Sequence, residues 1–277
     1  MMQKVYAGLL GCGSIGSGIA QAIDRGEAGD TELTIVYDPV QQMAEALAKS
    51  LLKKPFIARS VSDVLENGQV NLVIEAANQG VVREHIPDVL RNRKNLLIMS
   101  VGAFSDENLF LQVTSLAKQN GVRVYMPSGA IGGLDAVKAA AAAGLDEVSI
   151  TTTKPPRGLE GAPYVIQKKI DLKNLKERTV IYDGTAAEAA PLFPANVNVA
   201  LALSLAGLGP IKTKARVVAD PNATKNTHEI FARGPFGTLT VKIENVPSPT
   251  NPKTSWLAAL SAIRKIREIT ETVSLGT

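Results

Sequence analysis

A glycine-rich hexapeptide near the amino terminus has the spacing of a phosphate-binding loop. Residues 11–16 read Gly-Cys-Gly-Ser-Ile-Gly, a GxGxxG pattern that directly follows the apolar run Val5–Leu10. In such a loop Gly11 permits a tight turn, Gly13 lets the backbone approach a pyrophosphate, and Gly16 allows close packing of a helix on a strand. The exposed N–H groups and the positive end of the following helix then attract the phosphates. The candidate phosphate-binding residues are Gly11, Gly13, Ser14, Ile15 and Gly16.

Positions farther along the chain fit the rest of a dinucleotide. Asp38 closes the apolar run Leu33–Tyr37, 22 residues after Gly16. A carboxylate at that spacing accepts hydrogen bonds from both ribose hydroxyls and repels a 2′-phosphate, so it favours NAD over NADP. Ala76 and Ala77 follow a later apolar run, where small side chains suit close contact with a dinucleotide. Packing at the end of a strand is the alternative role for the two alanines.

The chain has two histidines, and one of them suits proton transfer. His228 lies at the start of a predicted strand in the second half of the chain. The unperturbed pKa of histidine, about 6.5, is appropriate for an acid–base group near neutral pH. In two-domain dehydrogenases the second domain supplies this group, so His228 is the catalytic candidate, and strand packing is the alternative. His85 lies on a predicted helix of the first half and is expected to be a helix-face residue.

Three other segments are candidates for contacts with the substrate or the nicotinamide. Residues 126–135 contain three glycines, which allow close approach. Residues 193–200 place Asn196 and Asn198 at the start of a predicted helix, and Asn198 is the candidate for the substrate. Residues 251–255 are predicted to start the last helix with a composition that suits a carboxylate. The candidate ligands there are Lys253, Thr254 and Ser255. A turn or a helix cap is the alternative for each segment.

The elements that must position these residues alternate in the first half of the chain. Six short apolar runs alternate with helical patterns of the length that joins parallel strands. This alternation predicts an α/β domain with right-handed βαβ units and a doubly wound parallel sheet of the Rossmann type. Within this domain, Ser62 and Ser105 are expected to cap helices, and Gly121 is expected to end one.

The pattern changes near Pro127. Period-2 alternation and β-branched runs predict strands over residues 148–154, 163–169, 214–219, 228–232 and 237–244. Helical patterns cover residues 134–143, 185–192 and 197–206. We therefore expect a second, mixed α/β domain with a largely antiparallel sheet. A linker or ordered loop is expected at 246–252, followed by an amphipathic helix over 254–272.

These patterns predict a division into two domains. Residues 1–128 are expected to form the dinucleotide-binding domain, and residues 129–246 the substrate and dimerisation domain. The C-terminal segment 247–277 is expected to pack back onto the first domain, because its helix has an apolar stripe at helical spacing.

Composition excludes several other classes of protein. The 277 residues carry a formal net charge of +4, contain no run of five or six like charges and are only 4% aromatic, so nucleic-acid binding is not expected. A single cysteine, Cys12, excludes an intrachain disulfide and a cysteine-rich zinc site, and no metal site is predicted. No apolar stretch of about 18 residues is present, so we expect a soluble, cytoplasmic protein that does not bind membranes.

Taken together, these segments resemble the L-aspartate dehydrogenase family. The resemblance spans almost the whole chain in order, and its later segments are far more specific than the glycine loop. The segments are residues 11–16, 127–135, 193–200, 226–230 and 244–255. The resemblance implies a homodimeric enzyme that uses NAD or NADP. Such an enzyme oxidises L-aspartate through iminoaspartate to oxaloacetate and ammonia, reversibly, and the imine can also feed NAD biosynthesis.

The same resemblance implies roles for single residues. His228 matches the family's active-site histidine, and Ala130 and Asn196 match its cofactor contacts on the nicotinamide side, with Asn198 as the alternative to Asn196. Two other functions stay open. A two-domain reductase of the homoserine dehydrogenase or dihydrodipicolinate reductase kind would share the Rossmann domain. A non-catalytic NAD(H)-binding regulator would need the glycine loop but neither His228 nor Lys253.

Overall fold

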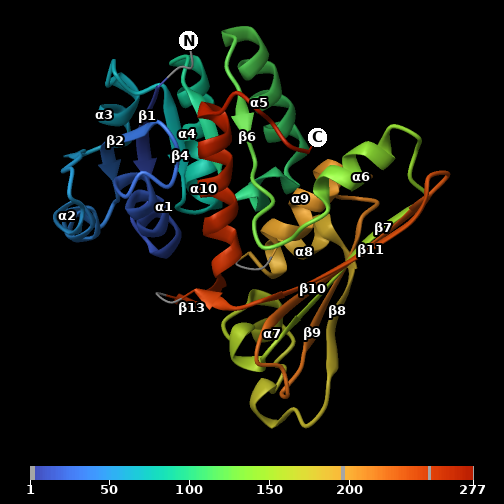
Figure 1. Cartoon of the computed structure of the whole chain (residues 1–277). Helices are drawn as coiled ribbons and strands as arrows, with labels where there is room; N and C mark the ends of the chain where they lie inside the picture. Colours follow the sequence, from blue (N-terminus) through green and yellow to red (C-terminus); the bar gives the residue numbers. More distant parts are fainter. Residues whose placement is uncertain (1–3, 195–196, 249–250, 277) are drawn as a thin grey trace. The chain divides into compact units, whose positions relative to one another are not determined.

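The computed structural model describes residues 4–194, 197–248 and 251–276, and the chain folds into two compact units. The first unit comprises Met1–Pro127 and Ala258–Leu275, and the second comprises Ser128–Leu257 and Gly276–Thr277. Each unit is built on a sheet of its own (Figure 1). Most of the last helix thus belongs to the first unit, although the second unit precedes it in the chain.

The first unit contains a six-stranded sheet in which every pairing is parallel. Its strand order, β3-β2-β1-β4-β5-β6, reverses between β1 and β4, which confirms the predicted doubly wound sheet of the Rossmann type. Its central strands are apolar because they are buried on both faces, and all four residues of β4 are buried. The strands are β1 (Val5–Leu10), β2 (Thr31–Tyr37), β3 (Phe56–Ile57), β4 (Leu72–Glu75), β5 (Asn95–Ile98) and β6 (Val124–Tyr125).

The helices of this unit connect the parallel strands. They are α1 (Ser14–Asp24), α2 (Gln41–Ser50), α3 (Val61–Glu66), α4 (Gln79–Arg91), α5 (Glu107–Asn120) and the 3₁₀ helix η1 (Val101–Ser105). Two predicted caps were wrong. Ser60 rather than Ser62 caps α3, and Asp106 rather than Ser105 caps α5. In both cases the capping side chain stands directly before the helix and accepts from an N–H two or three residues later, which the predicted residue is not placed to do.

Helix α10 (Trp256–Thr270) packs on the first unit through its apolar stripe. Ala262 and Ile266 are fully buried in a core cluster that also contains residues of β1 and β2, such as Leu9 and Val36. Ala258, Ile263 and Ile269 pack against the same cluster. The burial of this stripe supplies the main favourable free energy for the attachment of the helix.

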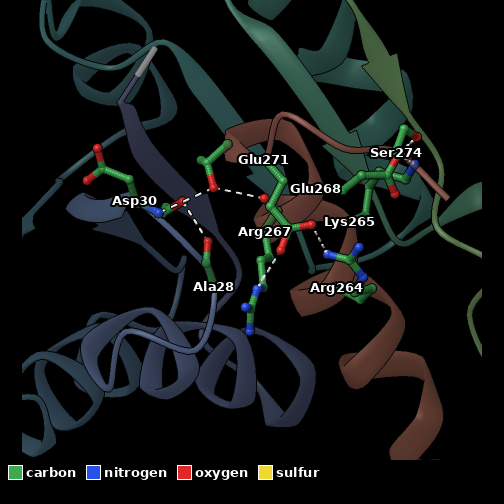
Figure 2. A network of polar contacts seen from close by, with 10 residues as sticks. Ala28, Asp30, Arg264, Lys265, Arg267, Glu268, Glu271 and Ser274 are labelled. Carbon is green, nitrogen blue, oxygen red and sulfur yellow. Dashed lines mark hydrogen bonds and ion pairs between the residues drawn. The ribbon is translucent and has the colours of Figure 1, made fainter. Parts of the chain in front are cut away.

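Polar contacts fix the end of the same helix (Figure 2). The Asp30 N–H donates to the Thr270 hydroxyl at 3.3 Å, which joins α10 to the turn before β2. Arg264 and Arg267 both donate to the carboxylate of Glu271, at 2.6 and 2.8 Å. The ion pairs lie along the helix surface, and each contributes little to stability. The position of α10 is therefore determined chiefly by its buried apolar stripe and by the Thr270 contact.

The second unit contains a five-stranded sheet of order β11-β10-β7-β9-β8. Strand β7 pairs in parallel with β9, whereas the other pairings within the described residues are antiparallel. The predicted mixed, largely antiparallel sheet is therefore confirmed. The strands are β7 (Glu147–Lys154), β8 (Thr179–Thr185), β9 (Lys214–Ala219), β10 (Asn226–Gly234) and β11 (Gly237–Asn245).

Helices cover one face of this sheet, and α9 packs on β7. The helices are α6 (Leu134–Ala141), α7 (Pro163–Gln167), α8 (Ala186–Leu192), α9 (Asn198–Ala206) and the 3₁₀ helices η2 (Pro156–Gly158) and η3 (Leu172–Asn174). Across residues 4–194, 197–248 and 251–276, none of the helices combines the length and apolar content needed to cross a membrane.

Parts of the second unit differ from the sequence prediction. Residues 163–169 were predicted as a strand but begin helix α7, because Pro163 takes the first helical position, where its missing N–H is not needed. Strand β8 was not predicted at all. Residues 251–255 were predicted to start the last helix but form strand β13 (Asn251–Ser255), which pairs with β12 (Pro247–Ser248). Pro252 disfavours a helical conformation of Asn251, and the pairing of the segment with β12 keeps it extended up to Ser255.

Candidate functional site

The predicted cofactor residues of the first unit gather at the carboxyl edge of its parallel sheet. Gly11 follows β1, and its N–H donates to the Tyr37 carbonyl at the end of β2, at 2.8 Å. On the other side of β1, the Ala76 N–H donates to the Leu10 carbonyl at 2.8 Å. Gly11, Asp38 and Ala76 therefore follow three adjacent strands where the strand order reverses. Doubly wound sheets bind their ligands at this position.

The three glycines of the loop have different reasons to be glycine. Gly11 has a φ of +98°, and a Cβ there would lie 2.7 Å from the Ala76 carbonyl oxygen. A Cβ on Gly16 would overlap the carbonyl oxygen of Gly11. At Gly13 the φ is −72°, and a Cβ would meet no protein atom within 4 Å. Neither conformation nor packing requires glycine at position 13, so the missing side chain leaves the backbone open to a phosphate, as NAD binding needs.

The helix that follows the loop is placed to bind an anion. Helix α1 begins at Ser14, so residues 14–16 of the glycine loop form its first turn. N–H groups of a first helical turn have no acceptor within the helix. The N-cap, Gly13, has no side-chain acceptor to offer them. The positive helix end and these N–H groups together fit a pyrophosphate.

Asp38 joins the glycine loop to the end of β2. One of its carboxylate oxygens accepts from the Cys12 N–H at 2.8 Å, and the other accepts from the Val40 N–H at 2.9 Å. These two bonds orient the carboxylate, and each oxygen retains a second lone pair for a ribose hydroxyl. The half-buried Asp38 thus has the geometry of a ribose ligand and also shapes the loop that receives the phosphates.

Cys12 in the same loop is a buried, unreactive thiol. Its side chain is 1% exposed. Burial raises the pKa of Cys12 to about 12, and the nearby charge of Asp38 adds to the shift. Since the thiolate is the nucleophile, a thiol that stays protonated at neutral pH takes no part in covalent chemistry.

Glu75 is a fully buried carboxylate at the same sheet edge, and the sequence analysis did not single it out. One oxygen accepts from the Ala77 N–H and the Ser100 hydroxyl, both at 2.8 Å. The other accepts from the N–H groups of Ser100 and Met99, at 2.9 and 3.2 Å. Burial raises the pKa of Glu75, and these hydrogen bonds oppose the rise. The carboxylate therefore fixes the loops after β4 and β5, including the predicted cofactor contacts Ala76 and Ala77.

The helix-covered face of the second sheet is apolar at one end and polar at the other. Apolar side chains such as Val148 and Ala232 fill one end. At the other end lies a group that we call the buried polar cluster, in which each side chain is at most 6% exposed. Its members are Thr152, Lys154, Asn226, His228 and Asn245. Buried polar groups at one end of an otherwise apolar face are costly, which makes them candidates for function.

His228 is held in this cluster by a hydroxyl. Its Nδ1 lies 2.9 Å from the Oγ1 of Thr152, which faces it in the pairing of β10 with β7. Because Nδ1 is engaged, Nε2 is the ring nitrogen that we assign to proton transfer. Burial lowers the pKa of His228 to about 3, and the positive charge of Lys154 adds to the shift. The imidazole is thus neutral near pH 7, the form that accepts a proton.

Two other predicted site residues, Ser255 and Ala130, are linked to the buried polar cluster by hydrogen bonds from asparagine side chains. The Asn226 side chain donates to the Ser255 hydroxyl at 3.5 Å. The Asn245 side chain donates to the Ala130 carbonyl at 2.9 Å. Asn226 lies two residues before His228 on β10, and Asn245 faces Asn226 from β11. The structure therefore brings together His228, Ser255 and Ala130, which are far apart in the sequence.

The remaining predicted residues are placed less completely. Asn198 is the first residue of α9 and is half-buried. Asn196 lies outside the described residues. Lys253 and Thr254 belong to strand β13, but their side chains lie outside the described part of the chain. His85 lies on α4, half-buried and 3.7 Å from the Glu84 carboxylate, and has no link to the other candidates among the contacts described.

Sequence reasoning missed Glu75, Thr152, Lys154 and Asn245, although three of them leave a trace in the pattern. Thr152 and Lys154 continue the buried positions of β7 after Val148 and Ile150, so polar side chains replace apolar ones on one face. Glu75 ends an otherwise apolar strand. A polar residue at a position that the period assigns to the core is the signal to look for.

Comparisons with known proteins cover nearly the whole chain. A family model described as the C-terminal domain of aspartate dehydrogenase matches residues 135–269. A second model, described as the NAD binding domain of homoserine dehydrogenase, matches residues 11–127. The second match agrees with the glycine loop and with Asp38, and the first covers the helices and strands that hold the buried polar cluster.

Relatives match over their full length. The L-aspartate dehydrogenase of Methanosarcina mazei is 45% identical over 270 residues, which are 98% of this chain and 98% of that protein. The L-aspartate dehydrogenase of Nitrosopumilus maritimus is 46% identical over 270 residues, 97% of this chain and 98% of that protein.

Solved structures show the same arrangement of elements. The crystal structure of aspartate dehydrogenase from Thermotoga maritima has a TM-score of 0.79 at 29% identity and covers 99% of this chain and 100% of that chain. A homoserine dehydrogenase from Thiobacillus denitrificans has a TM-score of 0.63 at 14% identity, covering 97% of this chain and 74% of that one. The second likeness is one of fold alone.

Proposed function

Because the chain belongs to the L-aspartate dehydrogenase family, we propose that it catalyses the NAD-dependent oxidative deamination of L-aspartate to oxaloacetate and ammonia, in either direction. The observation that carries the chemistry is the buried, neutral His228, held at Nδ1 by Thr152. A binding module would have no use for a proton acceptor sequestered from water in this way. The NAD supplies the hydride acceptor at its nicotinamide ring.

The reaction needs proton transfers that this histidine can perform. The substrate amine must be neutral before the α-carbon loses a hydride, and water must later add to the imine. Each step releases a proton near the α-carbon, and Nε2 of His228 is the acceptor in this proposal. The Thr152 hydroxyl orients the ring, so that the lone pair of Nε2 points in one fixed direction. In the reverse direction the same nitrogen returns the proton.

The residues of the first unit hold the cofactor in this proposal. The first turn of α1 and Gly13 bind the pyrophosphate, and Asp38 accepts from the ribose hydroxyls. Ala76 and Ala77, fixed by the buried Glu75, form the adjacent wall. Ala130 and Asn196 are the proposed contacts on the nicotinamide side, and Asn198, Lys253, Thr254 and Ser255 the proposed contacts of the substrate.

We further propose that residues 1–128 with 247–277 act as the cofactor domain and residues 129–246 as the substrate and dimerisation domain. The separation of the candidate residues supports this division, since the phosphate and ribose ligands follow the first sheet and the buried polar cluster lies on the second. The protein is a homodimer in this proposal, so sedimentation equilibrium should give twice the chain mass of 29.3 kDa. A monomer mass at micromolar concentration would contradict it.

The activity is tested by the consumption of NADH. We expect the protein to oxidise NADH when oxaloacetate and ammonium are both present, and to be inactive when ammonium is left out. Aspartate semialdehyde serves as the comparison substrate, because a homoserine dehydrogenase would reduce it. Turnover of the semialdehyde alone would assign the protein to that class of reductase, and NADH binding without any turnover would make it a binding protein.

The role of His228 is tested by its replacement. His228→Ala should lower kcat by about 10²–10⁴, the usual contribution of a positioned acid–base group. The affinity for NADH should stay near that of the wild type, because the phosphate and ribose ligands lie in the first unit. His228→Asn should not restore the rate, since an amide does not carry a proton at neutral pH.

The same variants separate catalysis from packing. A histidine that only packs between strands would lower the melting temperature and leave the turnover of each folded molecule nearly intact. We therefore expect His228→Ala to lose turnover per folded molecule, and we expect this loss to be unrelated to any change in its melting temperature. Both quantities are measured on one preparation. A folded and fully active His228→Ala would remove the catalytic assignment.

A further inference from the structure

One buried hydrogen bond joins the proposed nicotinamide contact to the strand beside His228. The side chain of Asn245, the last residue of β11, donates to the Ala130 carbonyl at 2.9 Å. Both residues are buried, Asn245 at 3% and Ala130 at 6% exposure. Because a buried amide or carbonyl without a partner is costly, such a bond favours one arrangement of the groups that it joins. Asn245 therefore fixes the position of the Ala130 carbonyl on the second unit.

Two glycines bring the rest of this loop, residues 129–133, onto the same strand. A Cβ on Gly132 would lie 3.5 Å from Cδ1 of Ile243. Gly133 has a φ of +79°, and a Cβ there would lie only 2.9 Å from Cγ2 of Val241. A side chain at position 133 would push the loop away from β11. As the loop runs forward, its contacts thus run backward along β11, in close approach at each point.

The register of the sheet places these contacts beside the proposed base. Ile243, against which Gly132 lies, faces His228 in the pairing of β11 with β10. Asn245 is two residues further along β11, on the same face, and so is a diagonal neighbour of His228, with Cβ atoms about 7 Å apart. One pair of strands therefore holds both the imidazole and the loop of Ala130, at a separation set by the backbone hydrogen bonds of the sheet.

We propose that Asn245 is a positioning residue for hydride transfer, which holds the Ala130 loop in a fixed place relative to His228. The inference rests on the proposed function, in which Ala130 contacts the nicotinamide and His228 accepts the proton of the substrate. Hydride transfer needs the two reacting carbons roughly 3–3.5 Å apart, so nicotinamide and base must be placed relative to the same substrate carbon. Asn245 can donate to a carbonyl, whereas the apolar residues that precede it on this face of β11 cannot.

The first test measures binding and needs no turnover. Asn245→Leu removes the amide and keeps a side chain of similar size. ADP-ribose has the phosphates and riboses of NADH but no nicotinamide, so it does not depend on the Ala130 loop. We expect Asn245→Leu to lower the affinity for NADH by about tenfold and to leave the affinity for ADP-ribose within about twofold of wild type. Titration calorimetry measures both.

The second test measures hydride transfer itself. A displacement of the nicotinamide by about 1 Å costs up to about 100-fold in rate. In a single turnover with oxaloacetate and ammonium, stopped-flow absorbance of NADH should therefore show a rate about 10–100-fold lower in Asn245→Leu. KM for oxaloacetate should change by at most about threefold. Asn245→Gln keeps the amide donor on a longer stem and should recover part of the rate and of the NADH affinity.

Asn71 supplies a matched control. Its amide also donates to a carbonyl, that of Lys4, and its oxygen accepts from the Tyr6 N–H, both at 2.9 Å. It lies directly before β4, at the edge of the first sheet opposite to the proposed cofactor ligands. Asn71→Leu should lower the melting temperature and leave the affinity ratio of NADH to ADP-ribose unchanged. The comparison separates the loss of an internal amide as such from the loss of the bond to Ala130.

Other outcomes would overturn the proposal. A folded Asn245→Leu with a wild-type affinity ratio and hydride-transfer rate would show that the bond only satisfies a buried carbonyl. Equal losses for NADH and ADP-ribose would place the effect in the fold as a whole. Equal affinities of the wild type for the two ligands would mean that the loop does not hold the nicotinamide. Should the leucine variant not fold, Asn245→Ala removes the amide without bulk and gives the same readouts.

Failure of the proposed function would be visible separately. A wild-type protein that does not oxidise NADH with oxaloacetate and ammonium is not an aspartate dehydrogenase, whatever the asparagine does. The titrations with NADH and ADP-ribose then still decide whether Asn245 positions a loop that contacts the nicotinamide.

Discussion

His228 owes its protonation state to where the fold buries it. The imidazole is 3% exposed and stands near the ammonium of Lys154, and both conditions disfavour a second positive charge. In the free protein the ring is therefore a weak base that is always in the accepting form at neutral pH.

This low pKa predicts a specific dependence of stability on pH. The unfolded chain protonates His228 near pH 6.5, whereas the folded chain does so only near pH 3. The contribution of the neutral imidazole to stability is thus complete above pH 6.5 and is lost as the pH falls toward 3, by at most about 1.4 kcal/mol per pH unit. We expect the free energy of unfolding of the wild type to fall toward that of His228→Gln over this range.

Urea titrations of both proteins at several pH values measure this difference. All other titrating groups, including His85, are common to the two proteins and cancel in the comparison. A constant difference from pH 7 to pH 4 would mean that His228 titrates at the same pH in the folded and unfolded chains. The acid limb of kcat/KM should likewise not lie at pH 6.5.

We expect Asp38 to determine the choice between NAD and NADP. Its carboxylate follows β2 and is oriented by the N–H groups of Cys12 and Val40, and in the proposed site it binds the ribose hydroxyls. A 2′-phosphate would meet this charge and lose two hydroxyl hydrogen bonds, at a cost of about 1–3 kcal/mol. We therefore expect kcat/KM for NAD to exceed that for NADP by tenfold or more. Asp38→Ser should reduce this ratio.

Asp38→Asn is the control for the hydrogen bonds to the loop. Its amide keeps one acceptor oxygen but has no charge, so a change of cofactor preference in this variant comes from the charge. Steady-state kinetics with both cofactors measure the ratio in each protein. Equal efficiencies in the wild type, unchanged in Asp38→Ser, would show that Asp38 does not determine the preference.

At the scale of elements, the attachment of α10 depends on one glycine in the turn before β2. Gly29 has a φ of +72°, and a Cβ there would overlap the Thr270 hydroxyl and lie 3.3 Å from Cα of Arg267. Gly29→Ala should therefore lower the free energy of unfolding by about 1–3 kcal/mol, because it adds a steric clash to the strain of the left-handed backbone. Urea unfolding followed by circular dichroism measures the loss.

Gly26 in the same loop separates these two causes. Its φ is +74°, but a Cβ there would meet no atom within 4 Å. Gly26→Ala thus carries the backbone strain alone, about 1 kcal/mol. The excess loss in Gly29→Ala belongs to the contact with α10. Equal losses of unfolding free energy in the two variants would mean that the turn shifts to accommodate the new Cβ without disturbing helix α10.

At the scale of the whole molecule, we propose that each unit contributes a different part of the chemistry. The proposed cofactor ligands lie at the carboxyl edge of the first sheet, where glycine, aspartate and alanine follow three adjacent strands. The second sheet uses a buried face, where polar side chains from three strands meet. The first arrangement exposes backbone N–H groups for phosphates. The second removes a base and a cation from water, which shifts their pKa values.

The amino-acid sequence by itself determined the first of these arrangements. The proposed cofactor ligands lie directly after strands, so each is recognised from a local pattern of a few residues. Gly11, Asp38 and Ala76 could be placed at one edge because parallel strands end at the same edge of their sheet. The same local logic failed at residues 163–167 and 251–255, where prolines fit a helix start in one case and an extended chain in the other.

Only the tertiary structure decided the second arrangement. His228 and Thr152 are 76 residues apart, and Asn245 and Ala130 are 115 residues apart. The register between such distant strands is determined by the packing of whole faces and not by any local pattern, and a shift of one residue would turn every side chain to the other face. The sequence thus identified the histidine, whereas the fold selected its neighbours Thr152 and Lys154 and, through burial, its protonation state.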